Sequence, residues 1–312
     1  MKITVTGGCG YVGSTLVPKL ATLADEVRVL DINPPALRPE AFPNNVKHHQ
    51  LDIADQANLK PLLQGSDLII HLAAVVGYPA CNKAPDIAVR CNVGGTTAVL
   101  RNKEKHAPVL FASTCSNYGE QNGLVTEDTP LNPTSLYGKT KVRAEELVLK
   151  DPRNIVFRFA GGFGRSPLTR DDLLIHDFVS QAVFGIPLSI YESHFVRQFI
   201  HVQDMTNAIV FAILNWEMMK GNVFNVGNPD IEITKKDLIE EMCKHMDFDY
   251  KFENSGMDLE RRNYPVSFEK LLGMGFKPSY SLAAGVQELI QYYQEEKSRR
   301  ARALRRPTQP TF

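Results

Sequence analysis

The 312-residue sequence carries little of what marks several classes of protein. It has no apolar run approaching the roughly 20 residues of a membrane-spanning helix, so no membrane span is expected. Lysine plus arginine and aspartate plus glutamate both total 35, so no excess of charge favours a nucleic acid or a membrane surface as partner. Any anionic ligand must therefore be bound by a local site.

Cysteine is scarce and scattered, with no C-x-x-C pair and none near a histidine at metal-ligand spacing. We therefore expect reduced thiols and no metal site. The beginning, MKITVTGG, lacks a basic segment followed by an apolar stretch of about 7–15 residues, so no secretory signal is expected. These features together predict a cytoplasmic enzyme. The five cysteines are Cys9, Cys81, Cys91, Cys115 and Cys243.

In the first half of the chain, short β-branched runs alternate with helix-like stretches, which is the pattern of repeated β-α-β units. Continuous apolar runs such as residues 68–70 lack a two-residue alternation, as expected where helices cover both faces of a parallel sheet. The sequence therefore predicts an α/β fold with a doubly wound parallel sheet of the Rossmann type. The candidate strands are residues 3–6, 27–31, 68–72, 109–113 and 155–159.

The second half is less regular and predicts a smaller, interleaved substrate domain. We expect a cofactor domain over residues 1–165 and a substrate-binding cap over residues 166–296. A short β-like run at 199–202 indicates that the chain returns to the first domain near 197–204. Residues 297–312 are basic and predicted to be a disordered tail, with an anion-binding arm as the alternative. Candidate cap helices are residues 173–184, 205–216, 235–245 and 283–295.

A glycine-rich turn follows the first candidate strand. Gly7, Gly10 and Gly13 form G-x-x-G-x-x-G before a helix-compatible stretch, where glycines let the backbone approach a pyrophosphate and the helix N-terminus offers free N–H groups. Asp31 ends the next strand, where a carboxylate accepts hydrogen bonds from ribose hydroxyls and repels a 2′-phosphate. NAD is therefore favoured over NADP. Pro18 fits poorly, because it lies inside the expected helix.

Tyr137 and Lys141 form Y-x-x-x-K, which places a phenol and an ammonium on one helix face. A phenol has a pKa near ~10 and is a poor base at neutral pH unless a positive charge stabilises the phenolate. The pattern alone is weak, since Tyr293 and Lys297 match it in a charged segment that predicts an ordinary surface helix. The strand and hydroxyl residues upstream of Tyr137 favour it over Tyr293 as the catalytic residue.

Hydroxyl side chains follow the strand upstream of Tyr137, at the edge where α/β sheets bind ligands. Thr114 is the candidate to hydrogen-bond the reacting alcohol, and Ser116 is expected to assist. A hydroxyl satisfied by a local turn is the alternative for Thr114.

With these residues in place, the chain resembles the extended short-chain dehydrogenases that act on nucleotide sugars, the group of UDP-galactose 4-epimerase. The resemblance spans nearly the whole length and implies that Tyr11, Val12, Leu72 and Ala74 lie in the cofactor site. It also implies that Asp52 and Ile53 lie beside the adenine ring and that Ala73 and Asn92 lie along the cofactor. The segments that carry it are 6–13, 52–53, 71–74, 92–96, 113–119, 137–141 and 197–204.

The resemblance also implies a substrate contact and two departures. Arg197 is expected on the substrate diphosphate, which its planar fork suits. Where 4-epimerases typically have an asparagine that contacts the nucleotide, this chain has residues 160–162, Ala-Gly-Gly. The 4,6-dehydratases carry Thr-Asp-Glu after the catalytic strand, whereas this chain has residues 114–116, Thr-Cys-Ser, without the acids that drive water elimination.

A narrower likeness links segments 166–174 and 261–264 to bacterial sugar 4-epimerases and 4-dehydrogenases. His176 falls where those relatives often have asparagine, so it is a candidate to face the substrate. A structural histidine is the alternative.

These observations predict an NAD-dependent nucleotide-sugar 4-epimerase with a transient 4-keto intermediate. A 4-dehydrogenase or 4-ketoreductase uses the same residues, and a non-catalytic dinucleotide-binding regulator is the third possibility. The expected partner is a nucleotide-diphosphate sugar, with neither nucleic acid nor membrane. The resemblance further implies a homodimer through helices near 92–105 and 137–149.

Overall fold

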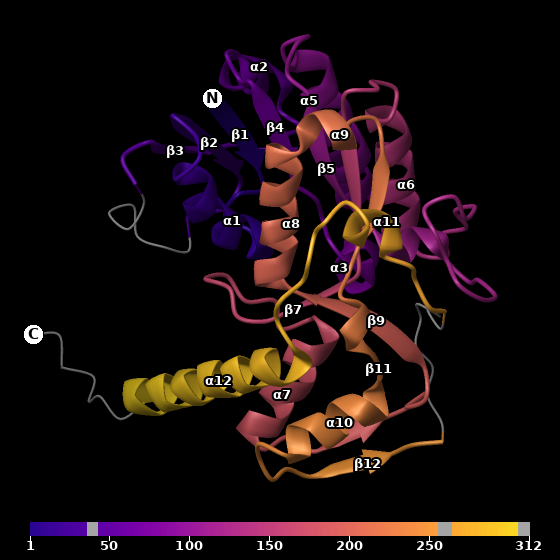
Figure 1. Cartoon of the computed structure of the whole chain (residues 1–312). Helices are drawn as coiled ribbons and strands as arrows, with labels where there is room; N and C mark the ends of the chain where they lie inside the picture. The colour runs from indigo at the N-terminus through magenta and orange to yellow at the C-terminus, as the bar shows by residue number, and fades with distance from the viewer. Residues whose placement is uncertain (36–42, 255–263, 305–312) are drawn as a thin grey trace, which may run out of the picture.

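The structure is a computed structural model that describes residues 1–35, 43–254 and 264–304. At its centre lies a parallel sheet of seven strands in the order β10-β6-β5-β4-β1-β2-β3 (Figure 1). Lys2 pairs with Glu26 and Ile3 with Leu68, so β1 lies between β2 and β4. The strands are β1 Lys2–Thr6, β2 Glu26–Asp31, β3 Val46–Gln50, β4 Leu68–His71, β5 Val109–Thr114, β6 Ile155–Phe159 and β10 Val223–Val226.

Helices cover both faces of this sheet, which confirms the doubly wound prediction. Ile70 packs in a core with Leu16 of α1 and Ile209 of α8, whereas its neighbour Ile69 packs with Val99 and Val148 on the opposite face. The apolar run of β4 therefore needs no alternation, because both faces of the strand are buried. The bounds are α1 Tyr11–Ala21, α8 Val202–Leu214 and α11 Glu269–Leu272 on one face and α2 Gln56–Leu63, α5 Thr96–Asn102 and α6 Leu136–Val148 on the other.

A smaller layer lies at the lower end of the sheet in Figure 1. It contains a three-stranded sheet, β11-β9-β7, and a two-stranded sheet, β12-β8. A separate core joins them, with Phe163, Val179, Leu238 and Leu289 almost fully buried. The elements are β7 Gly161–Phe163, α7 Leu174–Phe184, β8 Leu188–Ile190, β9 Val196–His201, β11 Glu232–Thr234, α10 Lys235–Cys243, β12 Tyr250–Phe252 and α12 Leu282–Leu304.

The two layers interleave along the chain. The β-like run predicted near 199–202 lies in β9, which pairs with β7 and β11 instead of joining the central sheet. The return to the central layer follows at α8, where Lys19 of α1 donates to Thr206 and Asn207 at 2.8 and 2.7 Å. Strand β10 then pairs with β6 at the sheet edge.

Short helical segments link the main elements. They are α3 Tyr78–Lys83, α4 Pro85–Val89, a π-helix at Arg90–Gly95, 3₁₀ turns at Cys115–Tyr118 and Pro229–Ile231, and α9 Trp216–Met219. Helix α1 accommodates Pro18 without ending. No described helix is long and apolar enough to cross a membrane.

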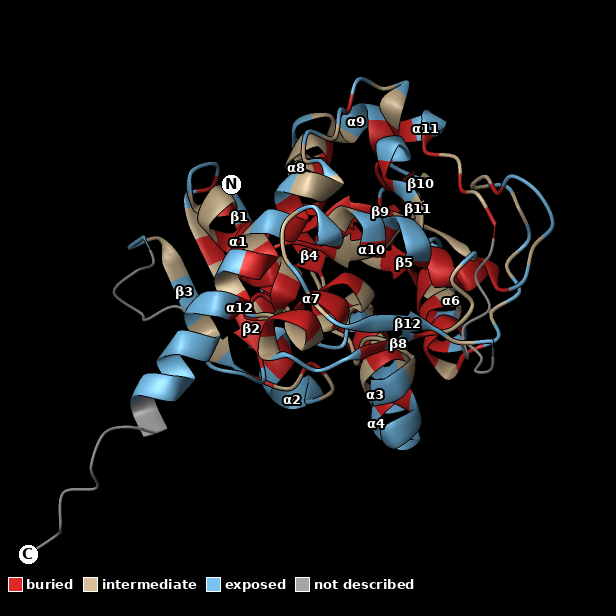
Figure 2. Ribbon diagram, turned by 90° about the horizontal axis from the view of Figure 1, so that it is seen from below, coloured by how far each residue is buried: buried red, intermediate tan, exposed pale blue. Residues whose placement is uncertain are grey.

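The C-terminal helix differs from the prediction at two places. Helix α12 continues through residues 297–304, where a disordered tail was expected, because Glu296 forms ion pairs with Arg299 and Arg300 one turn on. Its outer end is exposed and projects from the molecule (Figure 2). Tyr293 was predicted on a surface helix but is 2% exposed, and its hydroxyl donates to Asp171 at 2.7 Å. Residues 305–312 of the predicted tail lie outside the described residues.

Candidate active site

The glycine-rich turn connects β1 to α1. It lies at the end of the sheet beside the neighbouring strand β4, where the strand order reverses. Gly7 has a φ of +73°, and a Cβ atom there would lie 2.6 Å from the backbone nitrogen of Ala73 in the loop after β4. A Cβ atom on Gly13 would lie 2.4 Å from the carbonyl oxygen of Gly7. Only glycine fits at both positions, which brings the start of α1 close against the turn.

The start of α1 suits an anionic ligand. Its N-cap, Gly10, has no side chain to satisfy the first N–H groups of the helix. Beside this turn, the buried carboxylate of Asp31 accepts from the backbone N–H of Cys9 and of Asn33, both at 2.9 Å. The N–H groups at the start of α1 and the carboxylate at the end of β2 are compatible with the pyrophosphate and the adenosine ribose of a dinucleotide, and these contacts stay predictions.

Asp52 and Ile53 follow β3, and their side chains already have protein partners. The Asp52 carboxylate pairs with Arg90 at 2.8 Å and accepts from the N–H of Ala54 at 2.9 Å. Ile53 is buried against Gly95, where a Cβ atom would lie 2.5 Å from the isoleucine Cδ1. They therefore connect β3 to the π-helix, and their expected place beside an adenine ring stays a prediction.

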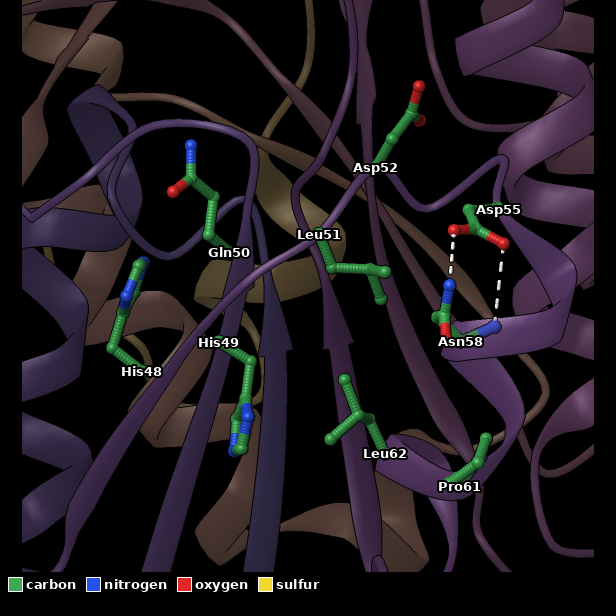
Figure 3. A pocket seen from close by; sticks show the side chains of 9 residues that line it. All are labelled: His48, His49, Gln50, Leu51, Asp52, Asp55, Asn58, Pro61 and Leu62. Carbon is green, nitrogen blue, oxygen red and sulfur yellow. Dashed lines mark hydrogen bonds between the residues drawn. The ribbon is translucent and has the colours of Figure 1, made fainter.

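A shallow hollow lies between β3 and α2 (Figure 3). The Asp52 carboxylate points away from His48 and His49 in this view. Four strand spacings separate β3 from β5, or about 19 Å, so the hollow is remote from the catalytic strand. Its lining residues are His48, His49, Gln50, Leu51, Asp52, Asp55, Asn58, Pro61 and Leu62.

Asn92 lies in the π-helix and is 1% exposed. Its amide accepts from the N–H of Val75 at 2.7 Å and donates to the carbonyl of Val75 at 3.0 Å and to Thr140 at 2.9 Å. The side chain thus holds the loop after β4, which includes Leu72 and Ala74, against the catalytic helix. Its expected place along the cofactor stays a prediction.

Tyr137 and Lys141 lie in the first two turns of α6, whose N-cap Ser135 accepts from the N–H of Gly138 at 3.1 Å. Both are buried, with 8% and 3% exposed surface. The Lys141 nitrogen lies 4.0 Å from the ring centroid of Phe111 on β5. Burial lowers the pKa of Lys141 to about 7, because the loss of hydrating water disfavours the charged ammonium.

Thr114 ends β5 beside this helix. Its hydroxyl accepts from the N–H of Ser116 at 3.1 Å and donates to the Ser116 hydroxyl at 3.2 Å. A Cβ atom on Gly138 would lie 3.2 Å from the Ser116 carbonyl oxygen, so the first turn of α6 packs directly on this segment. The structure therefore brings Thr114, Ser116 and Tyr137 to one edge of the sheet, although the turn predicted as the alternative for Thr114 is also present.

His176 and Tyr11 meet where the two layers join. The Tyr11 hydroxyl donates to the carbonyl of Gly164 at 2.8 Å and lies 3.4 Å from His176 Nε2. His176 is fully buried, and burial lowers its pKa to about 4, so the ring is neutral. Its Nδ1 is buried and has no hydrogen-bond partner among the described residues, so both the substrate-facing and the structural interpretation of His176 stay predictions. Val12 is half-buried and packs against the core beside α1.

Arg197 lies on β9, opposite Ile233 of β11, and is half-buried. Residues 261–263 of the segment 261–264, which carries the narrower likeness, lie outside the described residues. Its last residue, Tyr264, is buried and donates to the carbonyl of Cys115 at 3.1 Å, next to Thr114.

Arg170 and Asp172, for which the sequence predicts no role, form a bidentate pair beside the loop after β4. Arg170 Nε donates to Asp172 Oδ1 at 2.6 Å, and Arg170 Nη2 donates to Asp172 Oδ2 at 2.7 Å. A Cβ atom on Gly77 would lie 3.7 Å from Arg170 Nη2. Burial alone would lower the pKa of Arg170, but Asp172, Tyr137 and Tyr11 outweigh it and raise that pKa. The pair therefore places a cation near Tyr137. In the sequence, the place of both residues in the segment 166–174 was the signal that could have indicated a role for this pair.

This arrangement of a glycine-rich turn, a buried Tyr-Lys pair and a strand-end hydroxyl defines an extended short-chain dehydrogenase/reductase. Residues 3–227 match the model of the NAD dependent epimerase/dehydratase family. The chain belongs to this family of NAD-dependent enzymes.

The matched relatives catalyse different reactions on nucleotide sugars. The chain is 28% identical to a dTDP-glucose 4,6-dehydratase of Streptomyces niveus, over 96% of this chain and 94% of that protein. It is 30% identical to a UDP-glucose 4-epimerase of Lactobacillus helveticus, over 73% and 76%. A solved UDP-glucuronic acid 4-epimerase of Bacillus cereus, bound to UDP-glucuronic acid and NAD, matches with a TM-score of 0.85 and 25% identity, over 95% and 100%.

Proposed function

We propose that the chain is a nucleotide-sugar 4-epimerase that acts through a transient 4-keto sugar. The observation that carries the proposal is the buried Tyr137–Lys141 pair, packed beside Thr114 at the sheet edge that also holds the glycine-rich turn. The glycine-rich turn, the start of α1 and Asp31 would hold NAD, which would supply a reversible hydride acceptor for C4 of the sugar.

The side chains around C4 have distinct roles in this proposal. Tyr137 removes the proton of the 4-hydroxyl and later returns it, acting as general base and then general acid. The buried ammonium of Lys141 stabilises the phenolate, because opposite charges attract strongly where water is excluded. Thr114 and Ser116 hydrogen-bond the sugar hydroxyl, and Arg197 binds the diphosphate.

Epimerisation is preferred over dehydration because of the residues after Thr114. Position 115 is a cysteine, whose thiol donates to the Arg158 carbonyl at 3.2 Å, and position 116 is a serine, whose hydroxyl accepts from Thr114. Neither residue is a carboxylic acid that could protonate a leaving hydroxyl. The 4-epimerases among the relatives support the same choice. A net 4-dehydrogenase or 4-ketoreductase would use the same residues, and a non-catalytic regulator would have no need of the buried Tyr-Lys pair.

Product analysis on a panel of nucleotide sugars tests the proposal. An epimerase interconverts the C4 epimers, detected by NMR, with no net accumulation of NADH under catalytic amounts of enzyme. Stoichiometric NADH release without a C4 epimer would identify a dehydrogenase instead. Absence of both products across the panel, with NAD bound, would favour the regulator.

We propose further that the enzyme works in the cytoplasm as a homodimer through the outer faces of α5 and α6. Residues 1–165 would bind the cofactor and residues 166–296 the sugar nucleotide. Sedimentation equilibrium tests the dimer: a monomer at micromolar concentration would contradict it.

A further inference from the structure

Behind the Tyr137–Lys141 pair lies a buried charge that the mechanism above does not use. Glu145 is in the third turn of α6 and is 2% exposed. One carboxylate oxygen accepts from Arg158 Nε and Nη2 of β6, at 3.0 and 2.5 Å. The other accepts from the Ser113 hydroxyl at 2.7 Å and from the Asn117 amide at 3.1 Å.

These partners flank the catalytic hydroxyls. Ser113 directly precedes Thr114, Asn117 directly follows Ser116, and the Asn117 amide also donates to the Ser113 hydroxyl at 2.9 Å. One carboxylate on the catalytic helix therefore binds both ends of the segment that carries Thr114. The geometry fixes the helix of Tyr137 against that segment.

Arg158 extends the network to the edge of the sheet. Its Nη1 donates to the Tyr118 hydroxyl at 2.8 Å and to the Glu127 carbonyl at 3.0 Å, and Tyr118 donates to Asn225 of β10 at 2.7 Å. Burying such a pair is a weak source of stability, because the loss of hydration offsets the attraction. A role in the site gives a stronger reason for two buried charges at this place.

Glu145 also lies one turn from Lys141, on the same helix face. Among the described groups, Glu145 is the carboxylate that acts most strongly to raise the pKa of Lys141. Cys91 of the π-helix and Cys81 of α3 face it as thiols, and His71 of β4 is neutral, because burial and the Lys141 charge lower the pKa of that histidine to about 3.

We propose that Glu145 is a positioning residue of the active site, which holds α6 in register with the Thr114 segment and keeps Lys141 in its ammonium form. The inference rests on the proposed roles of Tyr137 and Lys141. It assigns Glu145 no contact with substrate or cofactor.

The test compares Glu145→Gln with a matched control. Asp151→Asn weakens the pairs that Asp151 forms with Lys103 at 3.4 Å and with Arg153 at 2.6 Å, beyond the far end of α6. That end, Val148, lies about 16 Å from Tyr137 at 1.5 Å per helical residue. Both variants lose an ionic contact, but only Glu145→Gln removes a charge near Lys141.

The expected readout is the alkaline limb of the pH profile of turnover, where Lys141 loses its proton. Removing the anion should shift that limb down by about one pH unit in Glu145→Gln, with NAD affinity unchanged. Asp151→Asn should keep the wild-type profile. Equal profiles for wild type and Glu145→Gln, or equal shifts in both variants, would overturn the proposal.

Two further measurements keep the outcome decisive. If Glu145→Gln fails to fold, the apolar pair Glu145→Leu with Arg158→Met keeps the volume and should still shift the limb down, because Glu145 is the nearer charge. NMR titration of ¹³C-labelled lysine, with Lys141→Arg to assign the signal, reports Lys141 without turnover. An unshifted titration overturns the role of Glu145 alone, whereas an active Tyr137→Phe variant overturns the proposed function.

Discussion

The proposed reacting centre combines the phenol of Tyr137, the ammonium of Lys141 and the hydroxyl of Thr114, all of them buried. Tyr137 lies in a small apolar cluster with Cys81 and Ala88, and Lys141 faces an aromatic ring. Each group would be a poor catalyst alone at neutral pH. Burial makes their mutual interaction strong, because charges attract more when water does not screen them.

Replacing Tyr137 with phenylalanine removes the proton-transfer group and keeps the ring. We expect turnover to fall by about 100-fold or more while NAD binding survives. Steady-state kinetics and calorimetry measure the two effects. The control is Tyr250→Phe, since Tyr250 on β12 is 43% exposed. Tyr293→Phe is a poorer control than the sequence indicated, because the Tyr293 hydroxyl bonds Asp171. Comparable losses in Tyr137→Phe and Tyr250→Phe would contradict the assignment.

Asp31 should determine which dinucleotide binds. Its carboxylate and a 2′-phosphate would both be negative within a few ångströms, so we expect NAD to bind more tightly than NADP. The variant Asp31→Ala should weaken this preference by about tenfold or more. Calorimetry with both cofactors measures it. The prediction is wrong if the wild type binds NADP equally well or if the preference survives the substitution.

At the scale of elements, the candidate site is built where three strand ends and two helix starts meet. The turn after β1, the loop after β4 and the end of β5 face the first turns of α1 and α6. The amide of Asn92 and the carboxylate of Glu145 connect these elements by hydrogen bonds. The geometry of the site therefore depends on side chains that are buried between elements.

Helix α12 provides a test of which part of an element carries stability. Val286, Leu289 and Tyr293 are buried in the cap core, and Lys297 donates to the Val183 carbonyl at 2.6 Å. Beyond Lys297 the described side chains are exposed. Deleting residues 298–312 should change the melting temperature by no more than about 3 °C and leave substrate affinity intact.

Truncation at residue 285 is the counterpart of that deletion. It removes the buried apolar side chains and should abolish cooperative unfolding in a thermal scan. A large loss of substrate affinity after deletion of 298–312 alone would instead show that the basic end binds the diphosphate.

At the scale of the whole molecule, the buried Lys141 opposes stability. Its pKa is lowered to about 7 in the folded chain from an ordinary value of 10.5. The unfolded chain therefore binds one more proton between these values, so this group makes the protein more stable as pH rises from about 7 to about 10.5. Below pH 7 the full cost of burying the ammonium is present.

The variant Lys141→Met should accordingly be inactive but more stable. We expect a gain on the order of 1–3 kcal/mol in the free energy of unfolding at pH 6, shrinking towards pH 10. Urea denaturation at several pH values measures it. A variant that is less stable than wild type at pH 6, or whose gain does not depend on pH, would show that Lys141 is stabilised by contacts that outweigh its burial.

Local patterns were sufficient to predict the strands β1, β2, β4, β5 and β6, the glycine-rich turn and the Tyr137–Lys141 pair. The seven-stranded sheet also has two edge strands that were not predicted. β3, with the sequence Val-Lys-His-His-Gln, is polar, and β10 follows its neighbour β6 only after more than 60 residues. An edge strand needs no continuous apolar run, because one side of it meets solvent.

What the sequence by itself determined is the chemistry that depends on spacing along the chain, such as glycines that fit a phosphate turn and side chains one helical turn apart. Only the tertiary structure decided the partners of the buried polar groups. Glu145 meets Ser113 and Arg158, Asn92 meets Val75, and Tyr293 meets Asp171. These contacts join residues that are 13 to 122 positions apart. Local periodicity carries no information about such partners, because they are set by how the sheet brings distant elements to one edge.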